Sequence, residues 1–213
     1  MKVAICTPVK DSPKLGYMDS LDALRAYTAR ERPDIEINRF TISTSTLPAS
    51  RNHLAHNALA WGADWLFWND DDQLFPANSL ARLLDLGHAV VGCNYVRKRV
   101  PAIPTAYRAS GELVYTTKAL SDAGTVEEVA FLGMGLLLTR RDAIEAIPAP
   151  RFELRPDPNG LDFVTEDYVL CDKIRKAGGR IMLDHGLSWR VGHIGEFIYS
   201  HLHVAKQRPA APS

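Results

Sequence analysis

The sequence has few cysteines, no excess charge of either sign and no long apolar run. Its three cysteines, Cys6, Cys93 and Cys171, are far apart and outside metal-ligand spacing, which argues for buried packing residues in a reducing compartment and against a disulfide framework. Lysine plus arginine and aspartate plus glutamate both number 25, so overall charge favours neither nucleic acid nor an anionic membrane. No stretch approaches a membrane span, and the first residues lack a long apolar signal core. We therefore expect a cytoplasmic protein.

The composition is that of an ordinary globular protein. A chain of 213 residues, 46% hydrophobic and 23% charged, can bury the core of one domain. We find no internal repeat and no separate linker, and expect a single domain over residues 1–206. The last residues, 207–213, are rich in proline and alanine and are expected to form a flexible tail.

Apolar runs and helical patterns alternate through the first half of the chain. Strands are expected at 2–7, 35–44, 65–69 and 89–93, and helices between them at about 21–32, 48–62 and 80–86. This alternation predicts an α/β fold with a mostly parallel, Rossmann-like sheet flanked by helices. Ligands bind beyond the carboxyl ends of such strands, where Thr7 and Pro8, the aspartates after residue 69, and Asn94 and Tyr95 fall.

The second half is less regular. We expect a hairpin from 113–117 and 127–130, which would form a small antiparallel element, and an apolar strand within 131–139. A loop at 151–163 is a candidate mobile flap. A capped helix is expected from Thr165 to Gly178, and a last strand at 180–183.

Three consecutive aspartates, Asp70, Asp71 and Asp72, follow the apolar strand at 65–69. In an extended segment alternate side chains face the same way, so Asp70 and Asp72 would converge. A hard divalent cation relieves the repulsion between them and leaves coordination positions for substrate phosphates. The alternative is a solvated acidic turn that caps the helix after Pro76.

Two further features are expected at the same sheet edge: Glu166 and Asp167 at a helix start, and His193 between two glycines in Trp-Arg-Val-Gly-His-Ile-Gly. Together with the aspartates, they make the chain resemble the GT-A-type nucleotide-sugar glycosyltransferases (family 2-like), whose DxD motif follows a sheet strand and holds a divalent ion against the donor diphosphate. The resemblance extends over nearly the whole chain.

The resemblance implies roles for the acids and the histidine. Asp70 would lie near the ribose and the metal ion, and Asp71 would lie within the donor site. Asp72 would ligate the ion, and His193 would be a further metal ligand. Because an imidazole suits Mn²⁺ better than Mg²⁺, Mn²⁺ is the favoured cofactor. The alternative for His193 is a hydrogen-bonded structural histidine.

Glu166 and Asp167 resemble the acidic pair that inverting members place beneath the acceptor. Asp167 is the leading candidate for the base that accepts the hydroxyl proton, with Glu166 as its neighbour. The alternative role is helix capping, because both acids occupy a first helical turn, where negative charges interact favourably with the helix dipole. Capping and catalysis can coexist.

Other residues are expected to bind the donor. Arg51 and Asn52 begin a helix where a guanidinium could pair with phosphate, the alternative being a surface salt bridge. The remaining expected donor-site residues are Thr7, Pro8, Gly133, Met134 and Gly135. A basic run, Arg97 to Arg99, could touch the diphosphate or an anionic acceptor, although such a triplet is usually a solvated loop.

The function implied by the resemblance is metal-dependent transfer of a sugar from a nucleotide-sugar donor to a hydroxyl. The acidic pair modestly favours inversion, and the alternative is retention, which needs no base at this position. The acceptor could be a glycan, a small molecule, a protein or a modified DNA base, bound by residues 94–107 and 151–163. Two alternatives are a sugar-nucleotide nucleotidyltransferase, whose glycine-rich phosphate loop is not found after the first strand, and a non-catalytic nucleotide- or carbohydrate-binding module. The donor sugar and the oligomeric state remain open.

Overall fold

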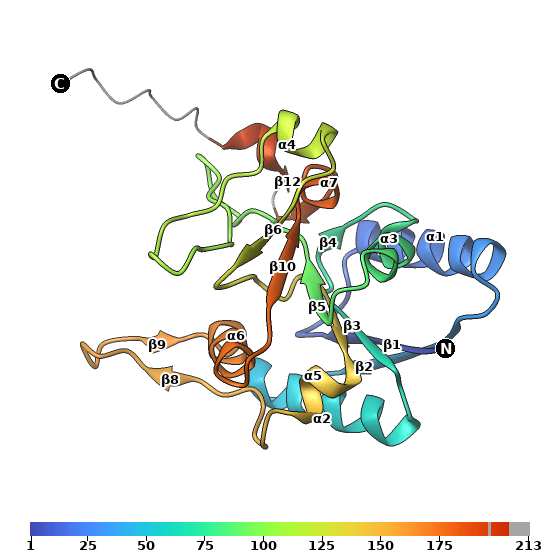
Figure 1. The fold of residues 1–213 in the computed structure, drawn as a ribbon, viewed down its shortest axis with the longest axis horizontal. Helices are drawn as coiled ribbons and strands as arrows, with labels where there is room; N and C mark the ends of the chain where they lie inside the picture. The colour runs from blue at the N-terminus through green and yellow to red at the C-terminus, as the bar shows by residue number, and fades with distance from the viewer. Residues whose placement is uncertain (196, 205–213) are drawn as a thin grey trace.

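A computed structural model of the chain describes residues 1–195 and 197–204, and within them a seven-stranded sheet forms the centre (Figure 1). Its strand order is β2-β1-β3-β7-β5-β10-β6. The strands are β1 Lys2–Pro8, β2 Glu36–Ile42, β3 Trp65–Asn69, β5 Val90–Gly92, β6 Val126–Val129, β7 Leu136–Arg140 and β10 Ile181–Asp184. Five run in one direction, while β7 and β6 are antiparallel to their neighbours. The expected α/β fold with a mostly parallel sheet is confirmed.

Helices cover both faces of this sheet. They are α1 Leu15–Glu31, α2 Leu47–Trp61, α3 Ser79–Asp85, α4 Lys118–Asp122, α5 Arg141–Glu145, α6 Glu166–Lys176 and α7 His185–Ser188, followed by a 3-10 turn at His201–His203. Pro48 lies in the first turn of α2, and Gly62 ends it in the left-handed conformation at φ 85°, which glycine adopts without steric cost. No described helix is long and apolar enough to cross a membrane.

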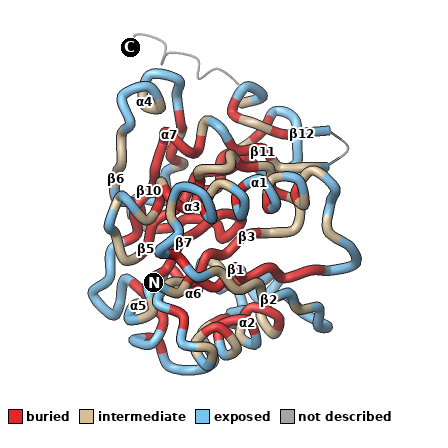
Figure 2. The backbone as a smooth tube through the Cα atoms, turned by 90° about the vertical axis from the view of Figure 1, so that its right-hand side faces the viewer, coloured by how far each residue is buried: buried red, intermediate tan, exposed pale blue. Residues whose placement is uncertain are grey.

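The period-two alternation of the strands divides the core into two halves. On β1, Ala4 and Cys6 pack in the cluster that contains α2, α5 and α6, whereas Val3 and Ile5 pack in the cluster that contains α1 and α3. Figure 2 shows the central strands largely buried. Burying a side chain such as Val3 or Ile5 contributes about 1.5–3 kcal/mol, so the sheet is a stable base for the loops at its edge.

Two small antiparallel sheets complete the fold. One joins β4 Gln73–Leu74, β11 Gly192–Ile194 and β12 Ile198–Tyr199, and the other is a hairpin of β8 Arg155–Pro156 and β9 Phe163–Val164. The hairpin projects from the body beside α6 (Figure 1). The first sheet attaches the C-terminal segment to the residues that follow the acidic turn.

Several expectations for the second half are wrong. Residues 113–117 form no strand, and Leu113 makes only an isolated bridge with Tyr107. Strand β6 pairs with β10 instead. The loop at 151–163 contains the β8–β9 hairpin, and two strands, β11 and β12, follow the expected last one. The expected tail at 207–213 lies outside the described residues. The three cysteines are buried and free, as expected.

Candidate functional site

A buried cluster of hydrogen-bonded polar side chains connects the carboxyl ends of β1 and β3. Thr7 Oγ1 and the Tyr17 hydroxyl each lie 2.7 Å from Asn69 Oδ1 and 2.7 Å from each other. Burial, the largest effect, raises the pKa of Tyr17 to about 12, so the hydroxyl keeps its proton. The cluster fixes the point from which the three aspartates leave the sheet, and Thr7 itself is fully buried.

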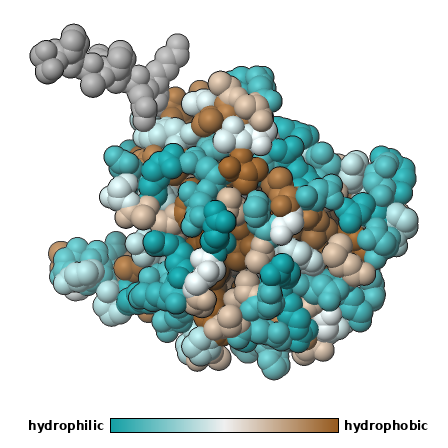
Figure 3. All heavy atoms as spheres, viewed as in Figure 1, coloured by the Kyte–Doolittle hydropathy of each residue, from teal (hydrophilic) through white to brown (hydrophobic). Residues whose placement is uncertain are grey.

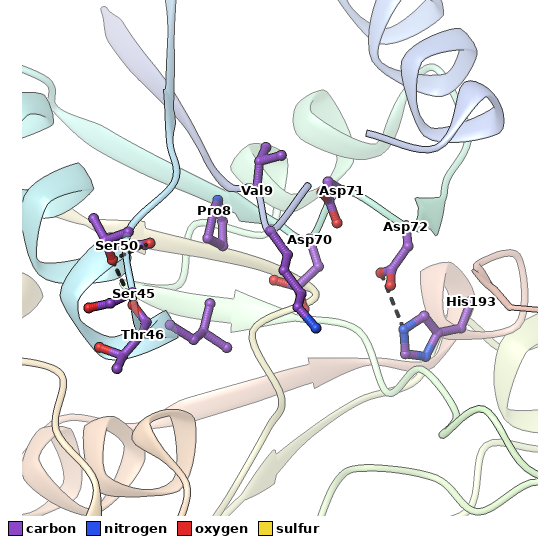
Figure 4. Close-up of a pocket in the computed structure, with 12 residues that line it drawn as sticks. Pro8, Val9, Ser45, Thr46, Ser50, Asp70, Asp71, Asp72 and His193 are labelled. Atoms are coloured by element: carbon purple, nitrogen blue, oxygen red, sulfur yellow. Dashed lines mark hydrogen bonds and ion pairs between the residues drawn. The ribbon is translucent and has the colours of Figure 1, made fainter. Parts of the chain in front are cut away.

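The aspartates lie in a turn and not on an extended strand, so the period-two expectation is wrong for them. The turn is closed by the Gln73 amide, which donates to the Asp70 carbonyl at 3.2 Å, and β4 begins directly after it. Asp70 and Asp72 therefore point in different directions, with Asp72 toward His193 (Figure 4). Burial, followed by the neighbouring carboxylates Asp72 and Asp70, raises the pKa of Asp71.

Asp70 faces a buried arginine. Arg51 Nη2 donates to Asp70 Oδ1 at 3.0 Å, and Arg51 Nε donates to Glu166 Oε1 at 3.1 Å. The Arg51 side chain is only 2% exposed, which contradicts the alternative of a surface salt bridge. Burial has the largest influence on the pKa of Glu166 and raises it, although the charge of Arg51 acts in the opposite direction. Arg51 thus connects the acidic turn to the start of α6.

Asp72 and His193 face each other across the cleft (Figure 4). Asp72 Oδ1 lies 3.3 Å from His193 Nε2 but has no well-formed hydrogen bond and is buried. His193 Nδ1 lies 2.9 Å from the Val96 carbonyl, which can only accept, so Nδ1 carries the proton. His193 Nε2 is then the ring atom that faces the carboxylate, and a histidine with its other ring nitrogen on a backbone carbonyl is in the arrangement typical of a metal ligand.

Lys98 is the second partner of Asp72, with its ammonium on Oδ2. Burial alone would raise the pKa of Asp72, but the adjacent His193 and Lys98 outweigh burial and hold it below its usual value. Asp72 is therefore a carboxylate at neutral pH. Its Oδ2 contacts the Lys98 ammonium, and its Oδ1 faces the His193 imidazole.

This donor set fits a divalent ion that takes its other ligands from elsewhere. The described residues contain no group of three or more histidine, cysteine or acidic side chains arranged to hold a metal. Asp72 Oδ1 and His193 Nε2 nevertheless supply two convergent donors. Mg²⁺ and similar ions are commonly bound by one or two protein groups plus water and substrate phosphates, so an orphaned carboxylate oxygen opposite an imidazole suits such an ion.

Of the two acids at the start of α6, only Asp167 reaches a cavity. Glu166 is buried against Arg51, whereas Asp167 is half-buried and lines a cavity of about 490 Å³ together with His193. Thr165 stands at the N-cap but makes no capping bond to the backbone. Its hydroxyl donates to Asp167 Oδ1, which also accepts the Tyr168 amide at 2.8 Å.

The comparisons with known proteins show the fold but no family. No family model matches the chain, and no curated protein matches its sequence. Among solved structures, the protein A197 from STIV superposes with a TM-score of 0.64 at 18% identity, covering 99% of this chain and 100% of that one. A mutant of the Drosophila beta-1,4-galactosyltransferase 7, in complex with manganese, UDP-Gal and xylobiose, superposes at 0.54 with 14% identity, covering 100% and 76%. The fold is GT-A.

On this GT-A scaffold the predicted donor-site and metal-site residues fall into two groups. Pro8, Asp70, Asp71, Asp72 and His193 line one cavity of about 370 Å³. The others do not line this cavity: Thr7, Arg51, Gly133, Met134 and Gly135 are buried, and Asn52 is half-buried.

Contacts explain the second group. Asn52 Nδ2 donates to the Pro48 and Phe152 carbonyls at 2.9 and 2.6 Å, and its Oδ1 accepts two amides of residues 151–152, so it attaches that segment to α2. Gly133 and Gly135 pack against the Tyr95 ring, where a Cβ would lie within 2.5 and 2.8 Å of ring or hydroxyl atoms. The glycines thus permit the close approach expected of them, but toward a tyrosine.

Sequence reasoning missed one wall of the cavity that the three aspartates and His193 line. It is formed by the residues after β1 and β2, namely Val9, Lys10, Thr44, Ser45, Thr46, Leu47 and Ser50. The signal was the hydroxyl run Ser43 to Thr46 at the carboxyl end of a predicted parallel strand, a position where ligands bind in such sheets. Five hydroxyl or amine side chains there are suited to a polar ligand.

Proposed function

We propose that the chain is a metal-dependent glycosyltransferase that moves a sugar from a nucleotide-sugar donor to a hydroxyl acceptor with inversion. The observation that carries the proposal is the position of the Asp72–His193 pair. His193 lines both the cavity beside the hydroxyl-rich wall and the cavity that contains Asp167. A donor in the first and an acceptor in the second would meet at this pair.

The donor side supports this assignment. In the Drosophila neighbour, manganese and UDP-Gal are bound together by a protein of the same fold. In this chain, Asp72 and His193 would hold Mn²⁺, which is favoured, or Mg²⁺, with Asp70 as a further predicted ligand. The chemistry that such an ion supplies, when bound, is neutralisation of negative charge on the leaving diphosphate. Lys10 and the hydroxyls of 44–46 would bind the nucleotide.

The acceptor side supports direct displacement. Asp167 would accept the acceptor's hydroxyl proton as that oxygen forms a bond to the anomeric carbon. The bond from that carbon to the phosphate oxygen breaks, and the nucleoside diphosphate leaves with the electron pair. Attack opposite the leaving group inverts the anomeric centre. Arg51 would act as a positioning residue, because it binds Asp70 and Glu166 without reaching either cavity.

The test is a thermal-shift and hydrolysis screen of nucleotide sugars with and without Mn²⁺, on the wild type and Asp72→Ala. We expect one donor to stabilise the wild type only with Mn²⁺, and the variant to lose both stabilisation and hydrolysis. Asp22→Ala, on an exposed face of α1, is the matched control and should behave as the wild type. Full activity of Asp72→Ala would refute the proposal, and donor binding without turnover would favour a binding module.

A further inference from the structure

A third cavity lies on the acceptor side, and its chemistry differs from that of the other two. It measures about 540 Å³, which is within the range of small-molecule sites. Its described lining contains no acidic residue. Three arginines and four aromatic residues stand out among the lining side chains: Arg97, Arg108, Arg175, Tyr107, Phe131, Phe163 and Tyr168.

This cavity adjoins the one that contains Asp167. Arg97, Phe131 and Thr165 line both of them. The wall of the larger cavity also includes residues from the β8–β9 hairpin, such as Phe163, and this projecting hairpin is largely hydrophilic on the face shown in Figure 3. A ligand in the larger cavity would therefore lie next to the cavity that contains Asp167.

Two of the three arginines have no carboxylate partner among the residues that the structure describes. Arg108 is neutralised by Glu127 at 2.7 Å. Arg97 instead donates to the Tyr107 hydroxyl at 3.1 Å, and no ion pair involves Arg175 within the described chain. Two exposed guanidinium groups beside one cavity with no acid in its lining favour a ligand with a negative charge.

The aromatic residues form a platform in the same cavity. The Phe131 ring lies between Tyr107, at 5.8 Å, and Tyr168, at 5.3 Å and tilted by 30°. Tyr168 is 48% exposed, so part of this platform is open to a ligand. Aromatic rings offer a large apolar face with a polar edge, which suits the ring of a sugar or another flat group.

We propose that the acceptor is an acidic saccharide, in which a carboxylate or phosphate group binds Arg97 and Arg175 while a sugar ring lies on the Phe131 platform. The proposal rests on the proposed function, because it places an acceptor hydroxyl near Asp167. A nucleic acid fits less well, since polyanions are bound by many phosphate contacts and basic tracks, whereas here two unpaired arginines border one cavity in a chain of zero net charge.

The first experiment measures binding by calorimetry and does not depend on turnover. The probes are matched sets in the gluco and galacto series: a neutral methyl glycoside, its uronic acid counterpart and the sugar 6-phosphate. We expect at least one acidic probe to bind about tenfold or more tightly than its neutral partner, with affinity falling as salt rises. Equal or weaker binding of every acidic probe would overturn the proposal.

Variants tie the preference to the two arginines. Arg97→Gln and Arg175→Gln should each lower the ratio of acidic to neutral affinity by about tenfold. Arg25→Gln, whose arginine lies on exposed α1, should leave the ratio unchanged, and circular dichroism verifies folding. An unchanged ratio in both cavity variants would contradict the assignment, as would tighter binding of a single-stranded oligonucleotide than of any saccharide. The donor screen fails or succeeds independently, so the two proposals are separable.

Discussion

His193 Nε2 lies 3.3 Å from Asp72 Oδ1, although Asp72 belongs to the first half of the chain and His193 to its C-terminal part. The contact depends on the small sheet, in which His193 pairs with Gln73, the residue after Asp72. The Ile194 amide also donates to the Asp72 carbonyl at 2.8 Å. The backbone therefore holds carboxylate and imidazole opposite each other without a bond between their side chains.

Replacing His193 should weaken divalent-ion binding. His193→Ala removes one of two convergent donors, and loss of a ligand should cost at least as much as loss of an outer-shell partner, about 10–100-fold in affinity. Calorimetric titration with Mn²⁺ in the presence of a nucleoside diphosphate measures the effect. His53→Ala, on an exposed part of α2, is the control. Equal affinity in both variants would leave His193 as a structural histidine.

Removing Lys98 should have the opposite effect. Its ammonium contacts Asp72 Oδ2 and so competes with a divalent cation for the same carboxylate. Because the lysine is 34% exposed and solvent screens the charge, we expect Lys98→Ala to tighten Mn²⁺ binding by about three- to tenfold. The same titration checks it, with Lys118→Ala, an exposed lysine on α4, as control. Weaker binding in Lys98→Ala would mean that the ammonium assists the ion through a bound phosphate.

The parts of the fold that sequence could predict are those with strong periodic signals. The strand at 65–69 and the helix that ends at Gly62 were predicted to within a residue, because buried apolar runs and a left-handed glycine are local features. Strands β4, β11 and β12 have only two or three residues and show no periodicity. They nevertheless bring His193 to Asp72.

The site was predictable in its location and less so in its contacts. A parallel sheet concentrates ligands at the carboxyl ends of its strands, and the acids, the hydroxyl run and His193 lie there. The burial of Arg51 could not be predicted, since its partner Glu166 is distant in sequence. For the same reason, nothing local showed that Asp70 would turn to Arg51 while Asp72 faced His193.

Arg51 should be important for stability. Arg51→Met leaves Glu166 buried at 7% exposure without its cation, and breaking a buried pair from one side typically costs about 3–5 kcal/mol. Urea unfolding measures the loss against Arg25→Met on exposed α1. Adding Glu166→Met to Arg51→Met should recover part of the stability, because the uncompensated charge is gone. If Arg51→Met were as stable as the wild type, water would already solvate the Arg51–Glu166 pair.

His201 should make the chain lose stability in mild acid. Burial, the largest effect, lowers the pKa of His201 to about 4. The ring lies 2.5 Å from the Asn94 carbonyl and stacks on Trp189, and the nearby His185 disfavours a further charge. Since the unfolded chain binds the proton at about pH 6.5 and the folded chain does not until about pH 4, stability falls as pH drops through this window and levels off below it.

The expected loss from this one group is about 2 kcal/mol between pH 7 and pH 5. Urea unfolding at the two pH values measures it, and His201→Gln separates it from the contribution of the carboxylates, because glutamine can donate to Asn94 but does not titrate. The pH dependence of the variant should be shallower by that amount. The same slope in both proteins would mean that His201 charges without unfolding the segment, by turning its ring out of the contact with Trp189.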